Sequence, residues 1–178
     1  MRPRIYFTSA DERKEIRRRG LAHLKQGKVP KTALLLGEKY KHLIGQDISP
    51  EVEIRWCSEE VGHGVFTQNL IAPDQYIGEY IGLVRQNIRF YFTPLNNYCF
   101  EYPIPDATGR HYVIDATDGN FTRFINHSNQ PNLRAIHVFV DGFYHLIFLS
   151  ARAIQAQEQL SYDYGPNYWA LRSPPQPL

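Results

Sequence analysis

The chain has 178 residues, with 20 Lys and Arg against 18 Asp and Glu, and a formal net charge of +2. Hydrophobic residues make up 43% of it and aromatic residues 13%, which excludes a wholly disordered chain and predicts a single globular domain. Two cysteines, Cys57 and Cys99, exclude a disulfide framework and an all-cysteine zinc site, and no apolar run reaches about 18 residues, so we expect a soluble chain without a membrane span or signal peptide.

The first predicted element is a helix over about residues 9–26. Ser9 is a suitable N-cap, and Glu12 stands three residues later, as in a capping box. A thin apolar stripe follows, formed by Ile16, Leu21 and Leu24. Gly27 and Pro30 interrupt the pattern, and a second helix is predicted over about residues 32–44, with Leu34, Leu35, Tyr40 and Leu43 on overlapping faces.

Positive charge is concentrated in this N-terminal part. Residues 1–47 carry 12 Lys and Arg against 5 Asp and Glu, whereas the remaining residues carry 8 against 13. A cluster at Arg13, Lys14, Arg17, Arg18 and Arg19 is a candidate for weak contact with nucleic acid or for a nuclear-import signal. Interleaved Asp11, Glu12 and Glu15 favour the alternative, a solvated helix face.

After Pro50 the pattern changes to short strands between turn residues. Turns are predicted at residues 72–75 and, as a hairpin, at Asp141-Gly142. The tail at 173–178 is proline-rich and expected to be disordered. The predicted strands are 52–57, 64–67, 76–83, 98–101, 112–115, 133–140 and 145–150.

The run Gly62-His63-Gly64 has two interpretations. It is typical of a glycine-rich turn before a strand. Alternatively, the missing Cβ atoms allow a ligand to approach the backbone closely. A phosphate loop is excluded, because no Lys-Ser/Thr pair or helix start follows.

Asn126-His127-Ser128 follows an apolar stretch and suggests a hydrolase at first. Neighbouring side chains on an extended chain point to opposite sides, so His127 is badly placed to activate Ser128. The seven histidines show no metal-binding spacing, and a buried structural histidine is the alternative for His127.

Tyr162 and Tyr164 lie two residues apart and therefore share one side of an extended segment. One interpretation is a strand face packed on the core. The other is a phenol-lined slot that holds an amine while it attacks a sulfonium methyl group, because aromatic faces attract cations and alignment accelerates transfer.

Four runs of residues together resemble the SET-domain protein-lysine methyltransferases over about residues 50–169: Arg123-Phe-Ile-Asn-His-Ser, Leu160-Ser-Tyr-Asp-Tyr-Gly, Gly62-His-Gly and Tyr76-Ile-Gly-Glu-Tyr-Ile-Gly. This resemblance implies a mainly β (α+β) fold of small twisted sheets with a pseudoknot between the first two runs. The resemblance places a catalytic SET domain over 50–165. It gives no account of the basic helical segment over 1–49, and residues 166–178 are expected to form a short C-terminal flank with the disordered tail.

The resemblance further assigns roles to individual residues. Tyr164 matches the catalytic tyrosine, and Tyr162 and Tyr80 are placed with it at the catalytic site. Tyr162 matches the position that influences how many methyl groups are added, and a tyrosine there favours mono- or dimethylation. The channel for the target lysine is lined by Tyr80, Phe100 and Tyr162. Contacts with the cofactor S-adenosylmethionine fall to Gly62, His63, Gly64, Tyr98, Asn126 and His127, with Trp169 added on this chain's own sequence.

The chain departs from the family pattern in its helical arm at 1–47, for which the family has no counterpart, and in its lack of zinc ligands. The family often has a zinc-binding cysteine where this chain has Asn129, and the cysteine-rich regions before and after the SET domain are missing, so we predict no metal. Another group must then close the cofactor site. Tyr168 and Trp169 are candidates for packing on adenine, and a C-terminal hydrophobic plug is the alternative.

The resemblance implies methyl transfer to lysine in a basic protein, and the expected substrate is a histone tail. The acidic body, which would attract a basic peptide, agrees with this substrate. The alternatives are a non-histone basic protein as substrate and a non-catalytic peptide-binding module on the same fold. The expected location is chromatin in the nucleus, in the nucleus of a host if the source is a bacterium, with the cytoplasm as the alternative.

Overall fold

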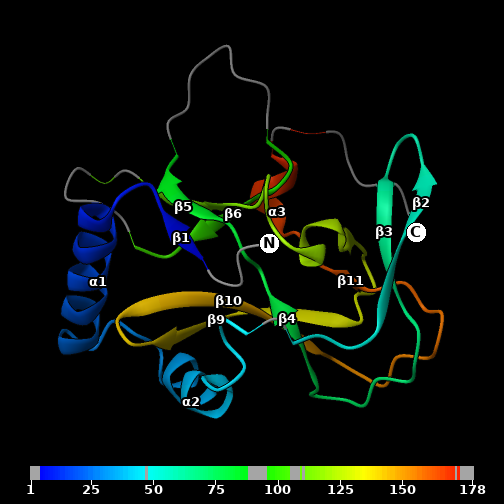
Figure 1. Ribbon diagram of the computed structural model, residues 1–178, viewed down its shortest axis with the longest axis horizontal. Coiled ribbons are helices and arrows are strands. Elements are labelled where there is room, and N and C mark those ends of the chain that lie inside the picture. Colours follow the sequence, from blue (N-terminus) through cyan, green and yellow to red (C-terminus); the bar gives the residue numbers. More distant parts are fainter. Residues whose placement is uncertain are drawn as a thin grey trace. The chain divides into compact units, whose positions relative to one another are not determined.

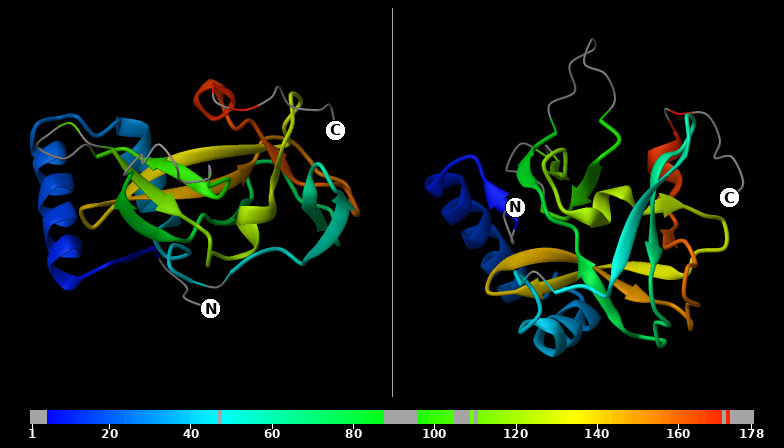
Figure 2. Two further views of the ribbon diagram at one scale, coloured as in Figure 1. Left: turned by 90° about the horizontal axis from the view of Figure 1, so that it is seen from above. Right: turned by 45° about the vertical axis from the view of Figure 1, so that its right-hand side comes forward.

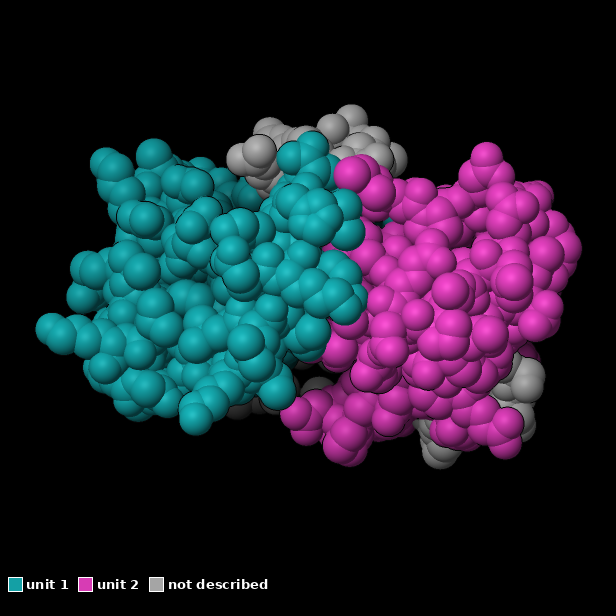
Figure 3. Space-filling model, turned by 90° about the horizontal axis from the view of Figure 1, so that it is seen from below, with its two compact units in different colours: residues 1–47, 79–123, 137–146 teal, residues 48–78, 124–136, 147–178 magenta. Residues whose placement is uncertain are grey.

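The computed structural model describes residues 5–46, 48–87, 96–104, 109, 111–170 and 172. The proline-rich tail at 173–178 lies outside the described residues. The chain divides into two compact units (Figure 3). Unit 1 comprises Met1–Asp47, Glu79–Arg123 and His137–Leu146, and unit 2 comprises Ile48–Gly78, Phe124–Ile136 and Ile147–Leu178. Strands predominate over helices among the described residues, which confirms the mainly β prediction.

Helix α1 (Ala10–Lys25) begins as predicted, because Ser9 Oγ accepts a hydrogen bond from the Glu12 amide at 3.1 Å. The Glu12 carboxylate accepts from the amide of Thr8 at 3.0 Å, one residue earlier than a capping box requires. Of the predicted stripe, Ile16 is fully buried, whereas Leu21 and Leu24 are each 40% exposed. The stripe was therefore only partly right, since α1 packs at Gly20 and not through the two leucines.

Helix α2 (Lys31–Tyr40) ends four residues before the predicted boundary. Its buried positions are Ala33, Gly37 and Tyr40, and Leu35 is 71% exposed, which corrects the predicted apolar face. A Cβ atom at Gly37 would lie only 2.3 Å from the carbonyl oxygen of Phe139. The helix therefore approaches a strand backbone more closely than any other residue type would allow.

Strands β9 (Leu133–Val140) and β10 (Phe143–Ser150) form the predicted hairpin, with Asp141 and Gly142 at positive φ angles of 52° and 90°. The tip of this hairpin lies beside α1 (Figure 1). A Cβ atom on Gly20 of α1 would be 2.0 Å from the Gly142 carbonyl oxygen. Strand β4 (Tyr76–Glu79) completes a three-stranded sheet in the order β4-β10-β9.

A four-stranded sheet in the order β1-β5-β7-β6 lies within unit 1. Its strands are β1 (Tyr6–Phe7), β5 (Leu83–Gln86), β7 (Tyr112–Asp115) and β6 (Cys99–Tyr102). The single strand predicted over 76–83 was wrong, because the chain changes partners there. The amide of Tyr80 donates to Leu146 on β10, whereas the carbonyl of Gly82 accepts from Tyr6 on β1.

Unit 2 contains two small two-stranded sheets. Strands β2 (Val52–Ser58) and β3 (Gly62–Thr67) pair as an antiparallel ribbon (Figure 2). Strands β8 (Asn126–His127) and β11 (Ser161–Tyr162) pair in parallel, and the chain continues into the short helix α3 (Pro166–Trp169). A 3-10 turn, Phe121–Phe124, precedes β8. No helix among the described residues is long and apolar enough to cross a membrane.

Candidate active site

The parallel pair β8–β11 brings the two most informative runs of the sequence together. Ser161 lies opposite Asn126 and Tyr162 opposite His127. Just beyond the pair, the amide of Ser128 donates to the Tyr162 carbonyl at 3.2 Å. The expected pairing of these segments, on which the predicted pseudoknot depends, is therefore confirmed.

Tyr162 and Tyr164 contact each other, with ring centroids 4.7 Å apart. Tyr162 is 7% exposed and packs on Phe148, so the strand-face interpretation holds for its ring. The Tyr164 hydroxyl lies 2.9 Å from the carbonyl oxygen of Ile125. Because a carbonyl can only accept, the phenol donates its proton there, and the Tyr164 oxygen can act towards a ligand only as an acceptor.

The two ring nitrogens of His127 have different partners. Its Nδ1 accepts from the amide of Tyr164 at 3.2 Å, which assigns the ring proton to Nε2, 3.2 Å from Asn129 Oδ1. Ser128 Oγ instead accepts from the amide of Gln130. The histidine therefore orients the Tyr164 backbone and does not activate the serine, so the hydrolase reading finds no support here.

Trp169 follows the two tyrosines on α3 and lies against His127, with ring centroids 4.9 Å apart. Its ring is within 13° of parallel to that of Tyr164 at 6.1 Å, and Tyr168 contacts it edge-on. The buried indole Nε1 has no hydrogen-bond acceptor among the described residues. A buried N–H without a partner costs about 1–3 kcal/mol, so an acceptor atom on a bound ligand would stabilise this arrangement, whereas an apolar plug would not.

The run from Gly62 to Gly64 forms the start of β3, and the turn lies before it at 59–61, which corrects the predicted turn. Gly62 has a φ of +76°, which favours glycine. At Gly64, a Cβ atom would lie 2.8 Å from Cys57 Sγ. The side-chain amide of Asn126 donates to the His63 carbonyl at 3.0 Å, so two of the predicted cofactor-binding segments of unit 2 are joined directly.

The other predicted site residues, Tyr80, Tyr98 and Phe100, belong to unit 1. The Tyr80 hydroxyl donates to the Tyr98 carbonyl at 2.8 Å, and the rings of Tyr80 and Phe100 are 5.8 Å apart. Tyr80 is 3% exposed. As with Tyr164, the phenol proton is committed to a carbonyl, which leaves the oxygen as an acceptor.

Two residues of unit 1 that contact Tyr98 or Phe100 were not predicted from the sequence to belong to the site. His137 on β9 lies edge-on to Phe100 at 5.6 Å, and its Nε2 is 3.0 Å from the Glu101 carbonyl oxygen. Burial lowers the pKa of His137, more than the Glu101 carbonyl raises it. The guanidinium of Arg123 lies 4.4 Å from the ring centre of Tyr98. Of these two residues, only Arg123 could have been found from the sequence, because it begins the run Arg123-Phe-Ile-Asn-His-Ser that resembles the SET family.

Metal ligands are not grouped in the structure as far as it is described: no three His, Cys, Asp or Glu residues there could hold an ion together. Cys57 is an exposed free thiol and Cys99 a half-buried one. The absence of zinc stays a prediction.

Comparison with known proteins identifies related sequences. A sequence model of the SET domain matches residues 62–165. Histone-lysine N-methyltransferase EHMT1 of Homo sapiens is 34% identical over 120 residues, which cover 65% of this chain and 9% of that protein. Histone-lysine N-methyltransferase set-2 of Caenorhabditis elegans is 38% identical over 109 residues, which cover 58% and 7%. The chain thus spans less than a tenth of the length of these curated relatives.

Among solved structures, the crystal structure of KRYPTONITE in complex with mCHH DNA, H3(1-15) peptide and SAH is similar, with a TM-score of 0.56 and 29% sequence identity. The likeness covers 74% of this chain and 26% of that one. It confirms the expected fold, and the SET-domain match covers more than half of the chain. The chain belongs to the SET-domain family.

Proposed function

We propose that the chain transfers methyl groups from S-adenosylmethionine to the side-chain amine of lysine in a basic protein, with a histone tail as substrate. The observation that carries this proposal is the β8–β11 pair, which sets Tyr162 and Tyr164 against Asn126 and His127. The histone-lysine methyltransferases among the relatives support the same reaction.

The residues of unit 2 fit the cofactor. S-adenosylmethionine, of which SAH is the demethylated product, supplies a methyl group on a positively charged sulfur. The unpartnered indole N–H of Trp169 is suited to a ring nitrogen or carboxylate of such a ligand. The linked backbone at His63 and side chain of Asn126 supply further polar groups, and the Cβ position at Gly62 has no atom of another described residue, its chain neighbours apart, within 4 Å.

The tyrosines supply the catalytic environment. Their ring faces attract both the sulfonium and a lysine ammonium. The Tyr164 oxygen, restricted to accepting, is suited to the partly positive hydrogens of an amine or of a methyl group in transfer. The proposal assigns the Tyr80 oxygen the same role and Phe100 contact with the lysine methylenes. Orientation of the amine and exclusion of water then lower the barrier without a covalent intermediate.

The charge of the chain favours a basic substrate. The residues after 47 carry 13 Asp and Glu against 8 Lys and Arg, which raises the association rate with a cationic peptide. The similar structure was solved with an H3 peptide. Action on chromatin in the nucleus follows from a histone substrate and is proposed with it.

The basic helix α1 is proposed to make at most a weak contact with nucleic acid. Glu15 accepts hydrogen bonds from Arg18 at 2.8 Å and Arg19 at 2.7 Å, and these bonds lower the pKa of its carboxyl to about 2. Arg17 donates to the Asp141 carbonyl at 3.0 Å. Lys14 pairs with Asp11 at 3.6 Å, and the Arg13 guanidinium lies 5.0 Å from the ring centre of Phe143. All five cations of the cluster thus have partners within unit 1, which favours the solvated-face interpretation.

The test is transfer of a radiolabelled methyl group from S-adenosylmethionine to separated core histones and to a cell lysate. Tyr164→Phe removes the hydroxyl that donates to Ile125, and we expect about 100-fold slower transfer, typical of losing one preorganised polar group. The matched control is Tyr112→Phe, which removes a phenol oxygen that accepts from Gln86. It should leave the rate unchanged.

A labelled histone band that weakens only in Tyr164→Phe supports both the reaction and the substrate. Label confined to lysate proteins other than histones would keep the reaction and reject the histone substrate. An unchanged rate in Tyr164→Phe would reject the role of that residue. No label with wild-type protein would favour the non-catalytic peptide-binding module.

A further inference from the structure

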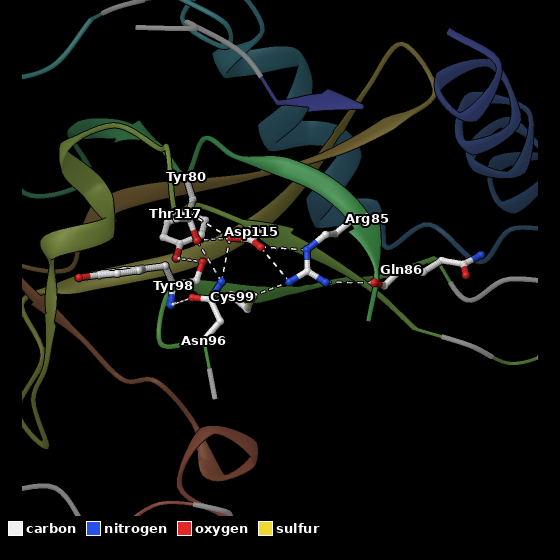
Figure 4. A network of polar contacts seen from close by, with 8 residues as sticks. All are labelled: Tyr80, Arg85, Gln86, Asn96, Tyr98, Cys99, Asp115 and Thr117. Carbon is white, nitrogen blue, oxygen red and sulfur yellow. Dashed lines mark hydrogen bonds and ion pairs between the residues drawn. The ribbon is translucent and has the colours of Figure 1, made fainter. Parts of the chain in front are cut away.

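A polar network in unit 1 is centred on Asp115, at the end of β7 (Figure 4). Its side chain is 14% exposed, and its two carboxylate oxygens have different partners. Oδ2 faces the guanidinium of Arg85, with Nε and the terminal nitrogen each at 2.8 Å. Oδ1 accepts from the amide and hydroxyl of Thr117, at 3.1 and 2.6 Å, and from Asn96 Nδ2 at 2.9 Å.

The carboxylate persists as an anion in this setting. Burial raises the pKa of Asp115, but the hydrogen bonds from Thr117 and the guanidinium of Arg85 together outweigh burial, so the pKa lies below its ordinary value. Each group that faces the carboxylate is a donor or a cation. The acceptor capacity of Asp115 is therefore constant at neutral pH.

The network continues from Asn96 to the predicted site residues. Asn96 Oδ1 accepts from the amide of Tyr98 at 2.8 Å. The carbonyl of Tyr98 accepts from the Ala116 amide at 2.9 Å and from the Tyr80 hydroxyl at 2.8 Å. Figure 4 shows this succession, with Asp115 between Arg85 on one side and Asn96 and Thr117 on the other.

Residues 96–98 lie in a turn before β6 and outside its ladder. The Tyr98 carbonyl accepts one backbone hydrogen bond, from Ala116, at the point where the β6–β7 pairing ends, whereas the Tyr98 amide is held by the Asn96 side chain. Side-chain contacts therefore contribute to fixing the backbone at residue 98. The position of the Tyr98 carbonyl in turn decides where the Tyr80 hydroxyl points, because a hydrogen bond is directional.

We propose that Asp115, acting through Asn96, is a positioning residue for methyl transfer, which holds the backbone on both sides of residue 98 in place and thereby helps to orient the Tyr80 phenol. This inference rests on the proposed function. It assigns the two oxygens of Asp115 different tasks: Oδ2 joins β5 to β7 through Arg85, and Oδ1 orients the residues of the site. A purely structural ion pair would need only the first.

The division between the oxygens supplies the experiment. Asn96→Ala removes the link to Tyr98 and leaves the Arg85–Asp115 pair in place. Methyl transfer and thermal melting are measured for Asn96→Ala, Tyr80→Phe and the double variant. The control is Asn69→Ala, an asparagine whose amide donates to Glu51 on the surface of unit 2 and whose loss should not change kcat.

We expect Asn96→Ala to lower kcat about 10- to 100-fold, the size of effect that a small misplacement of a reacting group produces. Because both changes act on the one hydrogen bond between Tyr80 and Tyr98, the double variant should be no slower than the slower single variant. Arg85→Lys keeps a cation at Oδ2 and leaves the partners of Oδ1 in place. It should lower the melting temperature while leaving kcat within about threefold of wild type, because it does not act on the hydrogen bond between Tyr80 and Tyr98.

Multiplicative losses of kcat in the double variant would overturn the proposal, since independent structural damage combines in that way. An unchanged kcat in Asn96→Ala would overturn it as well. In both of these outcomes, methyl transfer by the wild-type protein would still support the proposed function. No transfer by the wild-type protein would overturn the proposed function and this inference together.

Discussion

Asn132 connects the strand that starts the hairpin with the segment that leads into the tyrosines. Its side chain is 2% exposed and makes three hydrogen bonds within unit 2. Nδ2 donates to Glu158 Oε1 at 2.9 Å and to the Gln159 carbonyl at 2.8 Å, and Oδ1 accepts from the Ser161 amide at 2.9 Å. Asn132→Ala removes all three bonds at once.

The expected loss of stability depends on the polar groups that lose their hydrogen-bond partner. Ser161 is 5% exposed, so its amide loses a buried acceptor, at about 1–3 kcal/mol. The Gln159 carbonyl and the Glu158 carboxylate are closer to solvent and lose a net contribution of about 0.5–1.5 kcal/mol each. We therefore expect Asn132→Ala to lower the free energy of unfolding by about 3 kcal/mol.

Urea unfolding followed by far-UV circular dichroism measures this loss. The control is Arg152→Ala, which removes an exposed partner of the same Glu158 carboxylate and should cost at most about 1 kcal/mol. A loss below about 1 kcal/mol for Asn132→Ala, or one no larger than that of Arg152→Ala, would refute the reasoning. It would mean that the segment is held by its other contacts alone.

Two further predictions concern packing and pH. Gly37→Ala should lower the free energy of unfolding by about 1–3 kcal/mol, because the new Cβ atom would overlap the Phe139 carbonyl. Thermal melting measures this loss. The control is Leu35→Ala on the exposed face of the same helix, which should change the free energy of unfolding by less than about 0.5 kcal/mol. The Arg152 guanidinium lowers the pKa of Glu158 from 4.5 to about 2, so this carboxylate stabilises the fold above pH 4.5 and the contribution is lost as the pH falls towards 2. Urea unfolding at several pH values should show that loss, and Glu158→Gln should flatten it. An equally steep loss in the Gln variant would contradict the assignment.

Local signals in the sequence predicted local structure well. The Asp141-Gly142 hairpin and the Ser9 cap depend on a few adjacent residues, and both are confirmed. The faces of the N-terminal helices were predicted less well, because an apolar stripe indicates contact between side chains. Here the close contacts are between Gly20 or Gly37 and backbone carbonyls, which hydrophobicity does not record.

The candidate site shows the same limit at longer range. The contact between Tyr162 and Tyr164 followed from their spacing, and the pairing of β8 with β11 followed only from the family resemblance. His137 and Asp115 could not be assigned roles, because these depend on partners from other strands. No spacing within one segment indicates such partners.

The parallel pairing of β8 with β11 also has a consequence for the order of folding. The two strands are two residues long each, and the whole β9–β10 hairpin lies between them in the chain. The few hydrogen bonds of such a short pair cannot compensate the entropy lost when the intervening loop is closed. The β8–β11 pair should therefore form only after the hairpin has folded. Tyr162 and Tyr164 would then meet His127 late in folding, and methyl transfer would report on completion of the native state more sensitively than secondary-structure content does.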